Sequence, residues 1–377
     1  MNEHVDTLNK LNSDSPINKK LQFVHATIQE RYPSITRIAV ALFDDKSRTL
    51  STFIYSSDRP SPLYHYQARI DEVPSLKKLM ENGATRVIDD MPRALASEKP
   101  SEHTRALLEG GFQSSYTFPM FTNGVFLGFI FFNATRPGFF EPAVLAELDM
   151  SAHLIALLIY NEHATVRTLI ATVRSALLMT HSRDPETGSH LERMARYSRM
   201  IAQALAERHN LSDEYIEHIY LFAPIHDVGK LKVPDRILKK AGKLDPREMQ
   251  QMRQHARYGR ELIEALLENY QLEGVGYVSM LKNIPLYHHE KLNGEGYPEG
   301  LAGEAIPLEA RIIAVADIFD ALTSRRPYKD AWSNEEAIAE LRRLAGVQLD
   351  EECVEALVGQ RREIEEVQHL FKENDFG

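Results

Sequence analysis

The spacing of apolar residues changes along the chain near residue 140. Residues 1–140 contain short runs of branched and aromatic residues separated by turn residues, whereas apolar positions in residues 141–377 recur every three or four residues. The first pattern is typical of β-strands and the second of amphipathic helices. A chain of 377 residues also exceeds one ordinary domain. We therefore expect an N-terminal α+β domain and an all-α C-terminal domain.

Two hairpins are predicted in the N-terminal domain. Ile35–Phe43 is rich in branched residues and is followed by a turn at Asp44-Asp45 and a second strand-like run, Thr49–Tyr55. Further on, Asn123-Gly124 lies between two apolar runs, and this dipeptide is a strong signal for a two-residue hairpin turn.

The second hairpin resembles the end of a GAF domain. In that family a turn containing glycine joins two late strands, and a Phe-containing segment, here Phe139-Phe140-Glu141, precedes the final helix. The resemblance covers about residues 17–160 and implies a regulatory sensor domain. An unrelated α+β sensor or a purely architectural domain is the alternative. Cys353 lies far outside this region, so a thioether-linked bilin is not expected.

One stripe of apolar positions extends from Pro142 to about His181. Its members are mostly three or four residues apart, as one helix face requires: Leu145, Leu148, Ala152, Ile155, Ile159, Val166, Leu169, Val173 and Leu177. A helix of about 40 residues would be near 60 Å long, which suits a connector between domains. The alternative is two ordinary helices broken near Tyr160-Asn161. The stripe could pair with the same helix of a second subunit, so we expect a homodimer.

The composition limits the cellular compartment and the classes of binding partner that we expect for this protein. The net charge of −10 argues against a nucleic-acid polymer or an anionic membrane surface, since both favour basic patches. A single cysteine excludes a disulfide framework and fits a reducing compartment. The longest uninterrupted apolar run, Leu154–Tyr160, has seven residues, whereas a membrane span needs about 20. The N-terminus shows no secretory signal. We expect a cytoplasmic protein without a membrane span.

Adjacent side chains of metal-ligand type are the strongest chemical signal in the helical part. His226 and Asp227 are neighbours, and so are His288 and His289. Further donors of the same kind occur around them: Glu186, His190, His255 and Asp317. These donors exceed what one ion needs, and two ions about 3.5–4 Å apart are a standard device for in-line displacement at phosphorus. They predict a multinuclear metal site that cleaves a phosphate ester.

Local context supports several of these residues and leaves ordinary interpretations open. Glu186 and His190 are four residues apart and share one helix face, although a solvent-facing pair is the better explanation when they are taken alone. Lys230 follows His226 by four residues; by itself it would be an ordinary lysine near a helix C-terminus. Asp317 lies in an apolar helix, where a carboxylate is costly unless it is paired or metal-bound.

Two neighbouring positions extend this interpretation. Asp320 could orient a ligand histidine from behind the metal site. Gly229 offers an end to the helix that carries His226 and Asp227.

The order of these elements resembles the HD-GYP family. The resemblance rests on Asp184–Gly188 with His190, His226–Lys230, His255, His288–Glu290, Gly294–Pro298 and Asp317–Lys329, across about residues 165–365. It implies an all-helical phosphodiesterase that hydrolyses the bacterial messenger cyclic di-GMP to pGpG, and in some members onward to GMP. It also implies metal ligands at Glu186, His190, His226, Asp227, His255, His288, His289 and Asp317.

Further roles follow from the same resemblance. Asp227 would bridge the ions, and Lys230, Arg326 and Lys329 would meet substrate phosphates. Tyr297 would shape the substrate pocket, with plain turn punctuation as the alternative for its loop. The cofactors would be two or three divalent ions, iron or manganese. Three are favoured because Glu186, the position associated with a third metal, is present.

The resulting hypothesis is that metal-bound hydroxide attacks one phosphodiester and that Lys230 or water protonates the departing ribose oxygen. Metal binding can lower the pKa of water from about 15.7 to about 7. The alternatives are a phosphodiesterase for a hybrid cyclic GMP-AMP messenger, another phosphohydrolase of the HD superfamily, or a weakly catalytic cyclic-dinucleotide receptor.

The sequence thus predicts a GAF-like regulatory domain over residues 1–145, a connecting helix over 146–182 and an HD-GYP phosphodiesterase domain over 183–377. An unknown small-molecule or protein signal would act on the first domain. The connecting helix ends only a few residues before Glu186 and His190, so its displacement could move two ligands.

Overall fold

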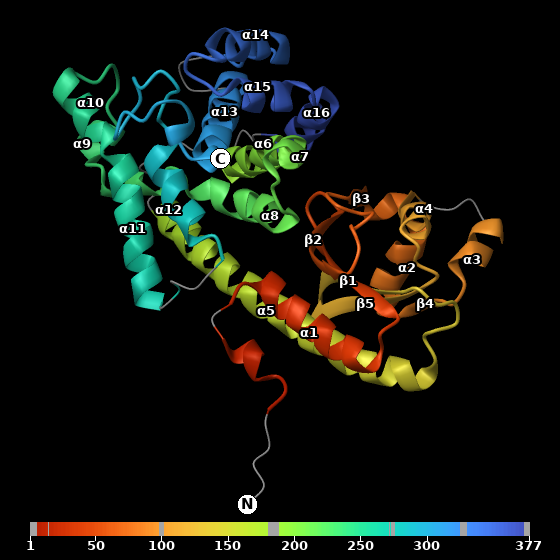
Figure 1. Cartoon of the computed structure of the whole chain (residues 1–377). Helices are drawn as coiled ribbons and strands as arrows, with labels where there is room; N and C mark the ends of the chain where they lie inside the picture. The colour runs from red at the N-terminus through yellow and green to blue at the C-terminus, as the bar shows by residue number, and fades with distance from the viewer. Residues whose placement is uncertain are drawn as a thin grey trace, which may run out of the picture. The chain divides into compact units, whose positions relative to one another are not determined.

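The computed structural model describes residues 6–13, 15–97, 102–179, 188–270, 272, 276–324 and 330–372. The chain divides into two compact units, Met1–Thr165 and Val166–Gly377. In the described residues the first unit combines a sheet with helices, and the second is helical (Figure 1). The predicted fold class, an α+β domain joined by a long helix to a helical domain, is confirmed.

A sheet of six described strands forms the centre of the N-terminal unit, in the order β3-β2-β1-β6-β5-β4. The strands are β1 (Ile35–Asp44), β2 (Thr49–Ser57), β3 (Gln67–Arg69), β4 (Arg86–Ile88), β5 (Ser114–Thr122) and β6 (Val125–Ala134). Both predicted hairpins are confirmed, since β1 pairs with β2 and β5 with β6 in antiparallel register. Asn123 and Gly124 have φ angles of 51° and 77°, the positive values that this tight turn requires.

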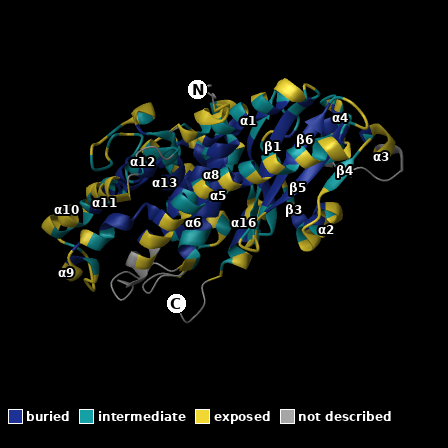
Figure 2. Cartoon of the chain, turned by 90° about the horizontal axis from the view of Figure 1, so that it is seen from below, coloured by how far each residue is buried: buried dark blue, intermediate teal, exposed yellow. Residues whose placement is uncertain are grey.

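Helices cover both faces of the sheet. α1 (Ile17–Arg31) and the first part of α5 pack against one face, and α2 (Pro74–Asn82) packs against the other. Along β6, Ile130 and Phe132 belong to the first layer while Phe129 and Phe131 belong to the second, as the alternation of side chains along a strand requires. The shorter helices α3 (Met91–Ser97) and α4 (Glu102–Glu109) complete the unit. Figure 2 shows strands β1 and β5 in the dark blue of buried residues.

The long helix α5 runs from Pro142 to Met179 without a break. The alternative of two helices broken near Tyr160-Asn161 is therefore excluded. Its apolar stripe serves two cores in turn: Leu148 to Ile159 pack in the core of the first unit, and Val166 to Val173 pack in that of the second. The stripe is long because both units use it.

Among the described helices, α5 also has the length and apolar composition of a membrane-spanning helix, over Pro142–Val173. Counting uninterrupted apolar runs missed this, because polar residues such as Asn161 and Glu162 divide the stretch. Core helices pass the same test, and the packing of α5 in two cores accounts for one apolar face. The absence of a membrane partner stays a prediction.

The C-terminal unit is built from helices around one apolar core. They are α6 (Gly188–Ala204), α7 (Ala206–His209), α8 (Asp213–Phe222), α9 (Asp235–Leu238), α10 (Pro246–Arg253), α11 (His255–Tyr270), α12 (Val278–Tyr287), α13 (Leu308–Thr323), α14 (Asn334–Leu344), α15 (Glu351–Val358) and α16 (Arg361–Leu370). Helix α6 contacts α8, α13, α15 and α16, so the residues on its buried face meet several other segments.

Local signals set where some of these helices begin. The hydroxyl of Ser212 accepts a hydrogen bond from the backbone N–H of Tyr215 at 3.0 Å, which caps α8. Asp184 and Pro185, which belong to the first segment of the family resemblance, lie outside the described residues. In the described chain α6 begins at Gly188.

Candidate metal centre

The tertiary structure brings seven of the eight predicted ligands together in two groups. One group contains Asp227, His255, His288 and His289, and the other contains His190, His226 and Asp317. Within each group the potential ligand atoms lie within 4.8 Å of one another. The residues come from α6, the junction of η3 (Ala223–Ile225) and η4 (Val228–Lys232), the start of α11, the end of α12 and α13. Glu186, the eighth, lies outside the described residues.

The junction that carries His226 and Asp227 depends on two residues with special backbones. Pro224 lacks an N–H, so the chain leaves the α-helical path after Phe222 and continues as a short 3-10 turn. At Gly229 a Cβ atom would lie 1.8 Å from the carbonyl oxygen of His255 and 2.4 Å from the backbone nitrogen of Gly259. Gly229 therefore allows η4 to lie directly against α11. The prediction that it ends a helix was wrong, because the requirement comes from the neighbouring helix.

Four histidine rings are oriented by hydrogen bonds from their Nδ1 atoms. Nδ1 of His226 donates to the carbonyl oxygen of Ala223 at 3.0 Å, and Nδ1 of His255 donates to that of Met252 at 2.8 Å. Nδ1 of His288 lies 3.0 Å from the carbonyl oxygen of Ile284. These carbonyls can only accept, so the proton resides on Nδ1 and the lone pair on Nε2.

His190 follows the same rule with a carboxylate as its acceptor. Its Nδ1 lies 2.7 Å from Oδ2 of Asp320, which is fully buried. Burial opposes the charge of Asp320, yet hydrogen bonds from His190 and Arg193 keep the pKa of this carboxyl below its ordinary value. Asp320 thus orients His190, as predicted. Asp317, and not Asp320, belongs to the group of potential metal ligands with His190 and His226.

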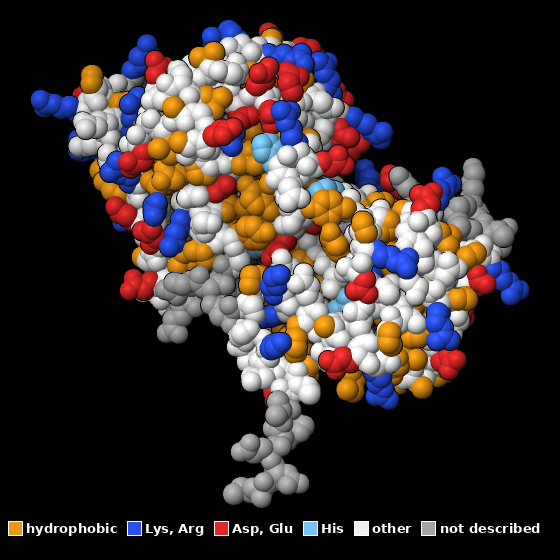
Figure 3. Space-filling view, viewed as in Figure 1, with side chains coloured by type: hydrophobic (Ala, Val, Ile, Leu, Met, Phe, Trp, Pro, Cys, Tyr) orange, Lys and Arg blue, Asp and Glu red, His pale blue; other side chains and the backbone are white. Residues whose placement is uncertain are grey.

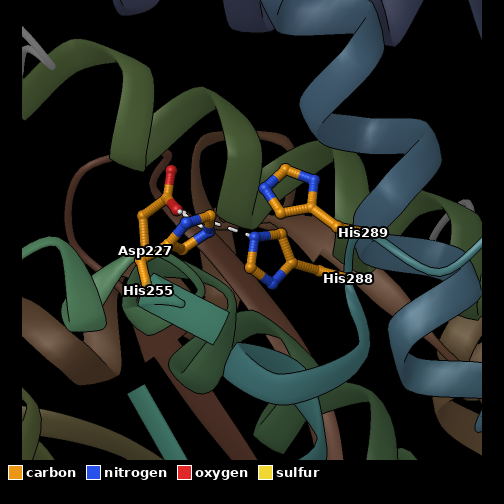
Figure 4. A group of neighbouring side chains, drawn as sticks. All are labelled: Asp227, His255, His288 and His289. Atoms are coloured by element: carbon orange, nitrogen blue, oxygen red, sulfur yellow. Dashed lines mark ion pairs between the residues drawn. The ribbon is translucent and has the colours of Figure 1, made fainter. Parts of the chain in front are cut away.

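The Asp227 carboxylate lies where the Nε2 atoms converge. Its Oδ1 is 3.1 Å from Nε2 of His255 and 3.6 Å from Nε2 of His288, and its Oδ2 is 3.3 Å from Nε2 of His226. Figure 4 shows the rings of His255 and His288 pointing toward this carboxylate. The oxygens and the ring nitrogens are all acceptors in the neutral tautomer, so a shared cation would satisfy them together.

Burial makes this arrangement costly without a cation. The Nε2 atoms of His255 and His288 are buried and find no hydrogen-bond partner among the described residues. Unsatisfied buried polar atoms are rare in native proteins and indicate a ligand or ion. Imidazole and carboxylate donors suit first-row divalent ions such as iron, manganese, zinc or nickel. The residues present therefore fit a metal centre.

Burial and neighbouring charges shift the pKa values of the carboxylate and the histidines in the centre. Burial opposes ionisation of Asp227, but the positive charge of Lys230, whose Nζ lies 2.9 Å from its Oδ2, holds the pKa of this carboxyl well below the ordinary range. Burial lowers the pKa of His288, and burial with the neighbouring His288 lowers that of His289 well below its usual value. Neutral imidazoles and an ionised carboxylate are the protonation states that bind metal.

The loop Gly294–Gly300 forms one wall of the centre, and Glu290 holds it. The Glu290 carboxylate accepts hydrogen bonds from the backbone N–H groups of Glu299, Gly300 and Leu301 at 2.7, 3.1 and 3.0 Å. The loop places the Tyr297 ring 4.7 Å from the His289 ring. The tyrosine in the Gly-Tyr-Pro sequence thus reaches the ligand histidines and does more than mark a turn.

Sequence reasoning missed three residues near the centre. Glu290 orders the loop, Arg193 contacts Asp320, and Arg253 lies 5.1 Å above the Tyr297 ring. The spacing of Arg193, three residues after His190 on one helix face, was a usable signal. The predicted phosphate contacts Arg326 and Lys329 lie outside the described residues.

A separate cavity lies in the N-terminal unit. It is lined by apolar residues and by the polar side chains of Arg37, Thr52, Tyr66 and His103. Burial, with the nearby charges of Arg37 and Arg86, lowers the pKa of His103 to about 3, so this imidazole is neutral at physiological pH. The cavity offers apolar walls with a few polar groups, as small-molecule sites do.

Residues 177–353 match the protein-family model described as HD domain. This part of the chain is similar in sequence to HD domains. Curated relatives include a cyclic di-GMP phosphodiesterase response regulator of Xanthomonas campestris, 44% identical over 49% of this chain and 46% of its own length. A cyclic di-GMP phosphodiesterase of Thermotoga maritima is 38% identical over 52% of this chain and 51% of its own.

Other relatives carry a different substrate in their names. A 3'3'-cGAMP-specific phosphodiesterase of Vibrio cholerae is 37% identical over 52% of this chain and 34% of its own length. The chain thus spans about half, or less, of the curated relatives it matches. It is also similar to a solved GAF domain of a cyanobacterial phytochrome, with a TM-score of 0.34 and 16% identity over 42% of this chain and 92% of that one. A GAF domain/HD domain protein from Geobacter sulfurreducens matches with a TM-score of 0.32 and 17% identity over 40% of this chain and 95% of that one.

Proposed function

We propose that this protein is a metal-dependent phosphodiesterase that hydrolyses cyclic di-GMP to pGpG, with GMP as a further product. The observation that carries the proposal is the convergence of Nε2 atoms on Asp227, with each Nδ1 of His190, His226, His255 and His288 occupied by an acceptor. The substrate is supported by HD-domain relatives that bear the name cyclic di-GMP phosphodiesterase.

Each residue has a role in this reaction. Asp227 contacts histidines of both ligand groups and would bridge their ions. Bound divalent ions supply a nucleophile by lowering the pKa of water. Lys230 would hold a phosphate oxygen or protonate the departing ribose oxygen, and Tyr297 would bound the substrate. Arg326 would bind a phosphate through two parallel N–H groups of its guanidinium, and Lys329 would bind one through its ammonium charge.

The ions would be two or three, with iron or manganese at the His and Asp donors. Two ligand groups support two ions. A third ion depends on Glu186, whose role is inferred from the sequence alone. Metal analysis of anaerobically purified protein, with and without Glu186→Gln, tests the count: a loss of one ion in the variant supports three.

The decisive experiment combines this metal analysis with a product assay. Metal-loaded protein is incubated with cyclic di-GMP, and the nucleotides are separated by chromatography, with chelated protein as the control. Appearance of pGpG only in the loaded sample supports the proposal. Unchanged dinucleotide that nevertheless binds would favour a receptor with weak or absent catalysis.

A hybrid cyclic GMP-AMP messenger is the second candidate substrate. It is favoured by relatives named 3'3'-cGAMP-specific phosphodiesterases, which match over the same share of the chain. Both dinucleotides are assayed side by side, and the ratio of kcat/KM values decides between them.

We also propose that the N-terminal unit regulates the HD domain in response to a small molecule. The cavity lined by Arg37 and His103 supports this. Filling it with Ala39→Leu should alter turnover without altering metal content. Unchanged turnover in that variant and in one lacking residues 1–160 would contradict regulation. The single cysteine fits a cytoplasmic location, which cell fractionation would check.

A homodimer through α5 is a further proposal. The stripe predicted to pair with a second subunit packs in the two cores of one chain, so the exposed face of α5 would form the contact. Met150 is 74% exposed and Leu157 is 55% exposed, and residues seven apart share one face of a coiled coil. Replacing both by Glu should halve the mass measured by light scattering. Val347→Glu, at a site 54% exposed in another part of the chain, is the control. On the face shown in Figure 3, basic and acidic side chains are interspersed.

A further inference from the structure

Arg193 on α6 joins three separate segments beside the candidate metal centre. Its Nε and Nη2 atoms donate to the two oxygens of Asp320 at 2.6 and 2.9 Å. Nη2 also donates to the hydroxyl of Ser324 at 2.6 Å, and Nη1 donates to the carbonyl oxygen of Phe371 at 2.9 Å. The side chain is almost fully buried, with 5% exposure. Such a set of contacts fixes the guanidinium plane.

The same carboxylate that receives this fork orients His190. Oδ2 of Asp320 accepts from Nδ1 of His190 at 2.7 Å and also from the hydroxyl of Ser324 at 3.1 Å. The other ring nitrogen of His190 belongs to the ligand group with His226 and Asp317. A shift of the Asp320 carboxylate would therefore turn the His190 ring and move one ligand atom of that group.

The segment that follows α16 is held along the first turns of α6. The hydroxyl of Ser189 donates to the carbonyl oxygen of Lys372 at 3.1 Å. The Arg196 guanidinium lies 4.4 Å above the Phe371 ring. Through Arg193, Phe371 is therefore linked to the carboxylate that orients His190 by two successive hydrogen bonds.

We propose that Arg193 is a positioning residue for the ion of the His190, His226 and Asp317 group, and that the Phe371–Lys372 segment acts on this ion through Arg193. A guanidinium suits this task because its planar fork holds both carboxylate oxygens and still reaches two further acceptors, which the single ammonium of a lysine cannot do. The inference rests on the proposed metal centre and is independent of which dinucleotide is the substrate.

The test is a stepwise titration of the metal-free full chain with Mn²⁺ under anaerobic conditions, followed by calorimetry. Asp317→Asn identifies the binding step that belongs to the His190 group. In Arg193→Lys the affinity of that step should fall about ten- to hundredfold, the usual effect of losing a partner that orients a metal ligand. The step of the Asp227, His255, His288 and His289 group should keep its affinity.

A matched control lies on the same helix. Arg199 forms a buried ion pair with Glu217 at 2.7 Å, six residues beyond Arg193. Arg199→Lys makes the same chemical change and should leave both steps unchanged. In an Asp320→Asn background, Arg193→Lys should add little, because Arg193 acts through that carboxylate.

Equal weakening of both steps, or no change in either, in Arg193→Lys would overturn the proposal. The same selective loss in Arg199→Lys would do so as well. If Arg193→Lys does not fold, Phe371→Ala replaces it: removing the ring under Arg196 should weaken the same step a few-fold, and an unchanged step overturns the proposal. If the wild-type chain takes up no Mn²⁺, iron or zinc, the metal centre itself is refuted, an outcome distinct from the loss of selectivity.

Discussion

The Nε2 atom of His255 lies 3.1 Å from Oδ1 of Asp227, and the Nδ1 atom of the same ring donates to the carbonyl oxygen of Met252. In the neutral ring, Nε2 and the carboxylate therefore face one another as two acceptors. The geometry is that of two ligands around a cation. It explains why a buried, ionised Asp227 is tolerated among histidines.

Replacing Asp227 by Ala should abolish both tight metal binding and turnover, because the residue contacts histidines of both ligand groups. Metal content and the rate of pGpG formation are measured on one preparation. Asp235→Asn on the nearby helix α9 is the control and should retain both. Hydrolysis of cyclic di-GMP by the Asp227→Ala protein at the wild-type rate would contradict the proposed mechanism.

Gly229→Ala should destabilise the HD domain by about 3 kcal/mol or more, since its Cβ would meet the carbonyl oxygen of His255 at 1.8 Å. Separation of η4 from α11 would also weaken metal binding. Denaturant unfolding and metal titration check both effects. Gly359→Ala is the matched control: its φ is −65° and the nearest contact of a Cβ is 3.4 Å, so stability should change by less than about 1 kcal/mol.

Glu290→Gln should loosen the Gly294–Gly300 loop. The carboxylate accepts from three backbone N–H groups, and an amide would turn a donor toward some of them. The cost is about 1–3 kcal/mol of stability. KM should rise more than kcat falls, because the loop bounds the substrate and contributes no proposed ligand. A variant with unaltered unfolding and KM would show that the loop is ordered without Glu290.

Stability should fall in mild acid because of His218. Burial lowers its folded-state pKa from 6.5 to about 4, so the unfolded chain binds a proton that the folded chain does not between these values. The contribution of His218 is fully present above pH 6.5 and is lost as the pH falls toward 4, by roughly 3 kcal/mol in all. The unfolding free energy is compared with that of His218→Leu across pH 4–7. Parallel curves for the two proteins would contradict the assignment.

Removal of metal should lower the thermal midpoint of the HD domain. An ion that binds only the folded chain adds about 3 kcal/mol when its concentration is 100-fold above Kd. Calorimetry before and after chelation measures the change, and re-addition of the ion should restore it. An identical midpoint in both states would argue that the site does not bind the ion tightly.

Local patterns predicted much of this molecule. The Asn123-Gly124 turn depends on residues adjacent in sequence, and it appears as predicted. The apolar spacing after Pro142 also predicted a helix, but it did not show whether that helix breaks near Tyr160. The helix is continuous and packs in two cores, and the sequence around a helix does not indicate which distant residues pack against it.

The sequence by itself determined the types of donor, their order and the helices and strands that carry them, since these follow from turn chemistry, apolar spacing and side-chain identity. The tertiary structure alone decided where the donors point. Asp320 orients His190 across 130 residues of chain, Gly229 meets the backbone of His255, and Arg193 reaches Phe371. Such contacts join segments far apart in sequence, where spacing carries no information about direction or distance.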